Sequence, residues 1–490
     1  MHRINATSGG WNPQSEGLIF LEQSPAPIVF LTSADTDIQT LAAAVPKLPT
    51  TFPALRVANL LQLQQQVSID DYVEKVLEFA QVIILRLLGG RSYWAYGLEV
   101  VQEIVQRNGT TLIVMPGDDA IDPDLISHST LPLSTVNQVW RYFNEGGVEN
   151  ILNALQFIAD TCFSTSFNPS PPQVVPRVGL YGWQMRDEGD EGAGGEINSK
   201  FKIQNSKLGV SSSSPSSSSS SSSPEPLASK VGILFYRAHY LAGNTKVIDA
   251  LCDALAKRNL TPVPIFVSSL RDVDVQTELC EFFQPKDTQQ IALLLNTTSF
   301  SLARLETETP QVDLWQKLDV PVLQVILSGG AVEQWELQFQ GLSPRDMAMN
   351  VALPEVDGRI ISRAVSFKAV QSSSSSLETD VVVYEPVSDR IEFVASLAAN
   401  WVRLRSKPPE ERRVALILAN YPTRNGRLAN GVGLDTPASC VEILQALQLA
   451  GYGVEDIPST GDELIECLTA GVTNDPEGRE LRPVLQGVSV

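Results

Sequence analysis

The chain has 490 residues and a formal net charge of −20 at pH 7. A chain of this length predicts about two to four domains. The acidic balance excludes nucleic acid and anionic membrane surfaces as expected partners, because both attract basic patches. Five scattered cysteines without a CxxC pair favour a reducing compartment. No run approaches the roughly 20 apolar residues of a membrane span, and the first residues lack the apolar core of a signal peptide. We therefore expect a cytoplasmic protein.

Residues 1–130 alternate short apolar runs with amphipathic segments. The predicted strands are Ile28–Leu31, Leu55–Leu63, Val82–Leu88 and Thr111–Met115. Helices are expected at Ile38–Val45, Tyr72–Phe79 and Tyr96–Arg107, the second of them capped by Ser68. Strands that alternate with helices in this way are typical of a doubly wound α/β domain.

Residues 131–175 predict a helical connector, which ends at a proline cluster. A second α/β domain is expected over 176–345, interrupted by a serine-rich insert at 186–229. This insert lacks the apolar residues of a core and is predicted to be disordered. It is interpreted either as a tolerated loop expansion, which we favour, or as a site of regulatory phosphorylation.

Residues 346–410 predict a smaller segment that contains β-structure, with a hairpin turn at Asp357-Gly358, an exposed loop at Ser372–Ser376 and a helix at Ile391–Leu404. Residues 411–490 predict the start of a third α/β domain. Its expected parts are strands at Arg413–Ala419 and Gly453–Ile457 and a helix that follows the N-cap Asp435. The chain is expected to stop before this domain is complete. The predicted fold class is α/β, with successive doubly wound, Rossmann-like or flavodoxin-like parallel sheets.

The stretch Val231–Leu270 carries the clearest functional signal. It predicts a strand, a polar elbow, a helix and a second, parallel strand. Ligands of open parallel sheets bind beyond the carboxyl ends of the strands, where the elbow places Arg237, His239 and Asn244. His239 is interpreted as a metal ligand or proton acceptor, or as a residue that hydrogen-bonds its own loop. Arg237 is interpreted as a guanidinium that binds a carboxylate through two hydrogen bonds, or as a member of a structural ion pair. Asn244 is interpreted as an anion contact or as a helix cap.

Other polar groups follow neighbouring predicted strands. Asn296 and Thr297 follow the strand predicted at Ile291–Leu295. They are interpreted either as members of a cleft shared with His239 or as ordinary polar residues of a loop, and the sequence favours neither interpretation. The basic, glycine-rich stretch Asn425–Asn430 precedes a capped helix, an arrangement that fits anion binding.

The sequence contains no GxxxxGK[ST] motif, so we expect no ATP hydrolysis by this chain. The sequence contains only three histidines, so we do not expect a histidine-rich metal site.

Several motifs together resemble one family, the large subunit of cobaltochelatase of the CobN type, and more distantly the H subunit of magnesium chelatase. They are RLLGGRSYWAYG from Arg86, MPGDD from Met115, NEGGVEN from Asn144, YRAHYLAGNT from Tyr236, LNTTSF from Leu295, GLSPRDMAMNVALPEVDGRI from Gly341 and ANYPTRNGRLANGVGLDTPAS from Ala419. Family members are longer, so the resemblance places this chain in the N-terminal portion.

The resemblance implies ATP-dependent insertion of Co²⁺ into hydrogenobyrinic acid a,c-diamide, a tetrapyrrole of cobalamin biosynthesis. AAA+ ATPase partner subunits would consume the ATP. His239 and Arg237 become the expected catalytic residues, with His239 also a metal ligand. The expected substrate-binding residues are Asn244, Asn296, Thr297, Arg345, Arg424 and Arg427. Two alternatives are a magnesium chelatase H-type subunit that binds protoporphyrin, and a truncated, non-catalytic tetrapyrrole-binding module.

Overall fold

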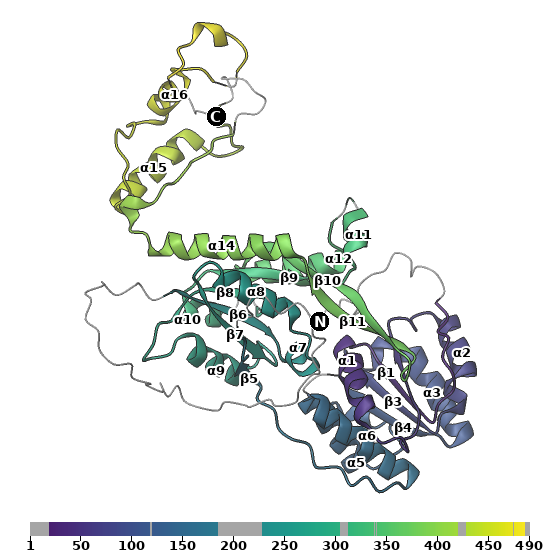
Figure 1. Ribbon diagram of the computed structural model, residues 1–490. Helices are drawn as coiled ribbons and strands as arrows, with labels where there is room; N and C mark the ends of the chain where they lie inside the picture. The colour runs from purple at the N-terminus through teal and green to yellow at the C-terminus, as the bar shows by residue number, and fades with distance from the viewer. Residues whose placement is uncertain are drawn as a thin grey trace, which may run out of the picture. The chain divides into compact units, whose positions relative to one another are not determined.

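The computed structural model describes residues 19–117, 120–184, 228–303, 312–337, 339, 341–419, 428–473 and 475–485. Most of the predicted disordered insert at 186–229 and part of the glycine-rich stretch at 425–430 lie outside these residues. The chain divides into two units, residues 1–399 and 400–490 (Figure 1).

Sheet A, the four-stranded sheet of the N-terminal region, is entirely parallel. Its order is β2 (Leu55–Asn59), β1 (Ile28–Thr32), β3 (Val82–Leu87) and β4 (Thr111–Pro116). Successive side chains of a strand point to opposite faces. Ile28 and Phe30 therefore pack with one set of helices, and Val29 and Leu31 with another.

Helices cover both faces of sheet A. One face packs against α1 (Asp35–Ala44), α5 (Leu133–Glu145) and α6 (Val148–Phe163), and the other against α2 (Gln66–Lys75) and α3 (Ala95–Asn108), with the short α4 (Pro123–Ile126) beside β4. The predicted connector at 131–175 is thus a packed layer of this domain, because α5 and α6 bury their apolar faces in its core. The predicted cap is wrong: Ser68 lies inside α2.

Sheet B, the seven-stranded sheet of the second region, is mostly parallel with antiparallel edges. Its order is β11 (Thr379–Pro386), β10 (Ile360–Ser374), β9 (Val322–Leu327), β8 (Ile291–Asn296), β6 (Lys230–Tyr236), β7 (Thr261–Val267) and β5 (Val178–Leu180). Strands β5 and β11 are antiparallel to their neighbours. The predicted parallel pair of β6 and β7 is confirmed. A single sheet crosses the expected boundary at 345, because β10 pairs with β9.

Short helices connect the strands of sheet B. They are α7 (Arg237–Ala242), α8 (Lys246–Ala256), α9 (Val273–Phe283), α10 (Asp313–Leu318), α11 (Val332–Leu337), α12 (Pro344–Asp346) and α13 (Leu353–Val356), with a π-helical turn at Met347–Ala352. The elbow predicted after the first strand contains the helix α7. Together the two sheets confirm a mixed α/β fold.

The predicted hairpin turn at Asp357-Gly358 is wrong. Gly358, with φ of 73°, follows α13 and leads into β10. The hairpin turn instead lies between β10 and β11, at residues 375–378. The first residues of the second serine run, 372–374, belong to β10 rather than to a loop. The long hairpin extends toward sheet A (Figure 1), where Val57 N donates to Leu377 O at 3.3 Å. Leu377 is fully buried in the core of sheet A.

The second unit, residues 400–490, contains α15 (Thr436–Leu449) and α16 (Gly461–Thr469), while α14 (Ser388–Ser406) runs across the division at residue 399. Asp435 accepts a hydrogen bond from Ala438 N, which confirms the predicted N-cap. The strands predicted at Arg413–Ala419 and Gly453–Ile457 do not form. A strand needs a neighbour to pair its backbone, and the described residues of this unit supply none. No described helix has the length and apolar character of a membrane span.

Candidate functional site

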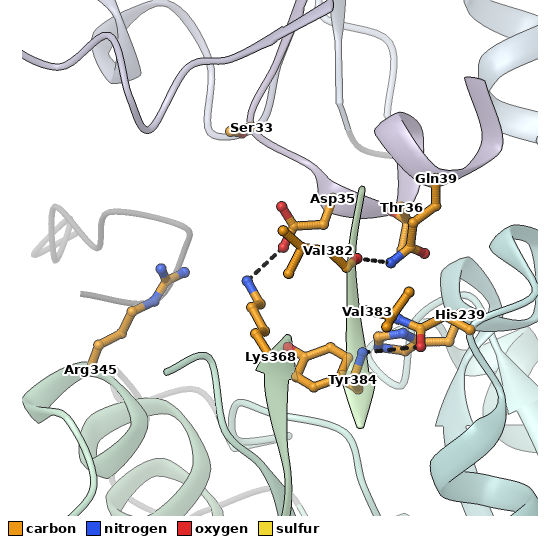
Figure 2. Close-up of a pocket in the computed structure, with 11 residues that line it drawn as sticks. Ser33, Asp35, Thr36, Gln39, His239, Arg345, Lys368, Val382, Val383 and Tyr384 are labelled. Atoms are coloured by element: carbon orange, nitrogen blue, oxygen red, sulfur yellow. Dashed lines mark hydrogen bonds and ion pairs between the residues drawn. The ribbon is translucent and has the colours of Figure 1, made fainter. Parts of the chain in front are cut away.

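A polar pocket lies within the first unit, where the carboxyl end of β1 meets the β10–β11 hairpin and α7. It has a cavity volume of about 170 Å³. The residues that line it are Ser33, Asp35, Thr36, Gln39, His239, Asn244, Arg345, Lys368, Val382, Val383 and Tyr384 (Figure 2). Three of the predicted site residues, His239, Asn244 and Arg345, therefore meet in one place.

An ion pair crosses the pocket from sheet A to sheet B. Lys368 Nζ on β10 lies 2.7 Å from Asp35 Oδ2 at the start of α1, and each side chain is 18% exposed. Burial alone would lower the pKa of Lys368, but the carboxylate of Asp35, together with Tyr384, raises it above its ordinary value. The lysine is therefore a fixed positive charge at neutral pH.

His239, on α7, is a neutral base in this pocket. Burial, and secondarily the Lys368 cation, lowers the pKa of His239 from 6.5 to about 4. Its ring packs edge-on against Tyr384, with centroids 5.4 Å apart. Its Nδ1 atom has no hydrogen-bond partner among the described residues. The backbone carbonyl of His239 accepts from Asn244 N, whereas the ring nitrogen Nδ1 stays available as a proton acceptor, metal ligand or N–H donor.

Asn244 and Arg345 occupy different sides of the pocket. Asn244 Oδ1 accepts from Tyr384 N at 3.3 Å, so it joins the α7–α8 turn to β11. Figure 2 shows Arg345 and His239 on opposite sides of the Asp35–Lys368 pair. Burial lowers the pKa of Arg345, although a guanidinium stays charged at neutral pH.

Asp35, Lys368 and Tyr384 are among the pocket residues that the sequence analysis missed. The sequence could have indicated Asp35, because this residue follows the predicted strand at Ile28–Leu31, at the edge where ligands of parallel sheets bind. Lys368 and Tyr384 lie inside strands, and only the pairing of β10 with β9 and β11 brings them here. No local sequence pattern reports that pairing.

Arg237 lies outside the pocket and makes a structural set of contacts. Its guanidinium donates to the backbone carbonyls of Pro176, Val175, Asn144 and Glu145 at 2.9–3.0 Å. It also pairs with Glu145 Oε2 at 3.3 Å. These bonds connect the end of α5 to the start of α7, as the ion-pair interpretation expected. A catalytic part for Arg237 stays a prediction.

Asn296 and Thr297 belong to a separate buried network at the carboxyl end of β8. Asn296 Nδ2 donates to Gln324 Oε1 at 2.7 Å, and Thr297 Oγ1 donates to Leu234 O at 2.9 Å. Their substrate-binding parts stay predictions. Arg424 and Arg427 lie outside the described residues. The described residues also hold no group of three or more His, Cys, Asp or Glu side chains that could bind a metal.

The lowered pKa of His239 predicts a pH-dependent stability. Above pH 6.5 the histidine is neutral in both states, but between 6.5 and about 4 only the unfolded chain takes up the proton. The free energy of unfolding therefore falls through this window, by about 3 kcal/mol for the histidine alone. Urea unfolding at pH 7 and pH 4.5 should show that His239→Asn gains stability relative to the wild type at the lower pH. Parallel pH dependence in the two proteins would contradict this expectation.

The fold and pocket define a class: a mixed α/β protein whose parallel sheets present a polar, mixed-charge pocket where strand ends meet a hairpin. Comparison with known proteins identifies the family. A family model described as CobN/Magnesium Chelatase matches residues 140–490, and the chain belongs to this family. The resemblance found in the sequence motifs is thereby confirmed.

Individual relatives agree with this assignment. The chain is 40% identical over 490 residues to the aerobic cobaltochelatase subunit CobN of Pseudomonas aeruginosa, covering 100% of this chain and 36% of that protein. It is 27% identical over 342 residues to the magnesium-chelatase H subunit of Chlorobaculum parvum, covering 67% of this chain and 24% of the relative.

A solved structure shows the same likeness. The catalytic subunit of cobaltochelatase from Mycobacterium tuberculosis matches with a TM-score of 0.53 and 28% identity, over 91% of this chain and 33% of that one. The chain thus spans about 36% of the length of the CobN relatives.

Proposed function

We propose that this chain is the N-terminal portion of a cobaltochelatase large subunit and contributes to tetrapyrrole binding during Co²⁺ insertion. The observation that carries the proposal is the difference between the relatives. Identity to the CobN subunits is 40% and 39% across nearly the whole chain. Identity to the magnesium-chelatase H subunit of Chlorobaculum parvum is 27% over two thirds of it.

The reaction in this proposal is formation of nitrogen–metal bonds in a ligase of several subunits. Co²⁺ and hydrogenobyrinic acid a,c-diamide are the substrates. AAA+ partner subunits hydrolyse the ATP, in keeping with the missing P-loop in this sequence. The protein acts in the cytoplasm.

The pocket residues take different parts in this proposal. Metal insertion requires removal of the N–H protons of the ring, and the neutral His239 is the pocket's proton acceptor. Asn244 and Arg345 contact the substrate, joined by Arg424 and Arg427. Arg237, Asn296 and Thr297 support the site by holding the ends of β6 and β8.

Titration of the purified 490-residue chain tests the proposal, with its tryptophan fluorescence as the signal. Hydrogenobyrinic acid a,c-diamide should quench the fluorescence saturably and bind more tightly than protoporphyrin. His239→Ala should weaken corrin binding, whereas His128→Ala, a histidine outside the pocket, should leave it unchanged. Absence of corrin binding, or tighter binding of protoporphyrin, would contradict the proposal, and the latter result would favour the magnesium branch.

A further inference from the structure

We propose that the exposed ring of Phe300 is a platform on which the ring system of the tetrapyrrole stacks. Phe300 lies in the loop that follows β8 and is not among the residues that line the pocket around His239. The inference takes its ligand from the proposed function and rests on it. It adds a contact residue for that ligand which neither the sequence nor the pocket indicated.

The backbone of Phe300 has a conformation that bulky residues rarely adopt. Its φ angle is 66°, in the left-handed region where the side chain of an L residue crowds the backbone. Glycine or asparagine would occupy this position at a lower steric cost. Residues held in such conformations cluster at active sites and at sites that hold a ligand. The turn of the chain therefore does not explain why an aromatic residue stands here.

The ring of Phe300 does not serve mainly to fill the core, because the residue is 46% exposed. Single exposed apolar residues are common on protein surfaces, so exposure alone would indicate nothing. Here the exposure is combined with a strained backbone. An aromatic face that is open to solvent can stack on another flat ring, as aromatic side chains do on nucleic-acid bases.

The loop that carries Phe300 is fixed by hydrogen bonds on both sides of the ring. Phe300 N donates to Met349 O at 3.0 Å, and Phe300 O accepts from the buried Arg359 Nη2 at 2.9 Å. The hydroxyl of Ser299 donates to Asn350 Oδ1 at 2.6 Å. The backbone beneath the ring is therefore ordered before a ligand binds, which reduces the entropy lost on binding.

Phe300 also lies where ligands of open α/β sheets bind. Strand β6 pairs with β7 on one side and with β8 on the other, so the order of the strands reverses between β6 and β8. Ligands bind beyond the carboxyl ends of the strands at such a reversal. Tyr236, the last residue of β6, accepts from Ser299 N at 3.1 Å, and its ring centroid lies 6.3 Å from that of His239. The proposed platform and the neutral His239 therefore belong to the same edge of sheet B.

Titration of the full chain with hydrogenobyrinic acid a,c-diamide and, separately, with protoporphyrin tests the platform, with the absorbance of the macrocycle as the signal. Phe300→Leu keeps an apolar side chain but removes the aromatic face. It should weaken binding by about tenfold, a typical loss when a stacking aromatic residue is removed. Phe300→Trp restores an aromatic face and should bind as the wild type does.

The matched control is Phe282→Leu. Phe282 is 37% exposed and lies near the end of α9, which leads to the amino end of β8 and so to the opposite edge of the sheet. This variant should leave binding unchanged. Equal affinities of Phe300→Leu and Phe282→Leu for the macrocycles would overturn the platform.

Phe300→Gly distinguishes a binding role from a structural one. Glycine adopts a positive φ without steric cost, so this variant should unfold at a urea concentration no lower than Phe300→Leu does. It should nevertheless bind the macrocycle at least about tenfold more weakly than the wild type. If Phe300→Gly instead unfolds at a much lower urea concentration than Phe300→Leu, the ring is needed for the fold and the platform is wrong.

The two macrocycles separate the platform from the proposed function. If protoporphyrin binds more tightly than the corrin and Phe300→Leu weakens its binding, the cobalt function is wrong and the platform is supported. If the corrin binds more tightly and Phe300→Leu leaves its affinity unchanged, only the platform is wrong. If neither macrocycle binds to the wild type, both are wrong.

Discussion

Arg359→Met is expected to lower the free energy of unfolding by about 3–5 kcal/mol, because it breaks a buried ion pair and leaves its partner uncompensated. Arg359 Nη2 lies 2.6 Å from Asp357 Oδ2, and the two side chains are 1% and 0% exposed. The guanidinium also donates to the carbonyl of Phe300 at 2.9 Å and to Gln324 Oε1 at 3.1 Å. Its loss therefore removes several donors from buried acceptors at once.

The partner carboxylate has its own hydrogen bonds, which makes a double-mutant cycle informative. Asp357 accepts from Leu302 N at 2.8 Å and from Ala303 N at 3.1 Å. These contacts, against the opposing effect of burial, hold the pKa of Asp357 below its ordinary value. Asp357 thus stays charged in Arg359→Met. Adding Asp357→Asn should recover part of the loss, because it removes the unpaired charge.

Urea denaturation measures these changes, with Arg363→Met as the matched control. Arg363 lies on β10, shortly after Arg359, is exposed, and stacks over Phe393 with its guanidinium carbon 3.5 Å from the ring centroid. Removing an exposed cation–π contact costs about 1 kcal/mol or less. If the free energy of unfolding falls no more in Arg359→Met than in Arg363→Met, the buried pair does not stabilise sheet B.

The elements that the sequence predicted well are those with strong local periodicity. Ile28, Phe30, Val29 and Leu31 form a continuous apolar run, as buried parallel strands do, and the helices around sheet A show clear amphipathic spacing. The βαβ unit at β6, α8 and β7 has the same strong pattern. Local residues determine such elements, so single-sequence reasoning finds them.

Elements that depend on distant pairing were predicted poorly. Val414 and Ile417 have the apolar character of a strand but are exposed, since the described part of the second unit offers no neighbouring strand. Conversely, Ser372 has poor strand propensity yet joins β10, because its pairing with Val381 on β11 stabilises it. Asp357-Gly358 was misread because the Asp357 carboxylate bonds to residues 301–303 instead of forming a hairpin turn.

The residues of the candidate site show the same difference between local sequence patterns, which could be predicted, and distant pairing, which could not. His239 and Asn244 were found because they follow a clear strand, and Arg345 because of a family motif. Arg237, also at that strand end, turns away to bind backbone carbonyls near α5. Lys368 could not be found, since its place opposite Asp35 depends on how the hairpin crosses between the two sheets.

Leu377→Ala, at the tip of that hairpin, is expected to lower the free energy of unfolding by about 2–5 kcal/mol, the usual cost of deleting a buried leucine side chain. Leu377 is fully buried in the core of sheet A, although it belongs to the hairpin that completes sheet B. Next to it, Glu378 pairs with Arg56 at 2.9 Å and accepts from Ser24 N at 2.6 Å. The hairpin tip is therefore fixed to sheet A by both apolar and polar contacts.

The same substitution should weaken the corrin binding proposed for the pocket, because Lys368 and Tyr384 lie on the two strands of this hairpin while Ser33 and Asp35 belong to the sheet A side. Val370→Ala is the matched control, since Val370 lies on β10 but is 60% exposed. It should change the free energy of unfolding by no more than about 0.5 kcal/mol and leave corrin binding unchanged. If Leu377→Ala destabilises the protein but binds the corrin as the wild type does, corrin binding does not depend on the contact between the hairpin and sheet A. Equal unfolding curves for the two variants would show instead that Leu377 contributes little to that contact.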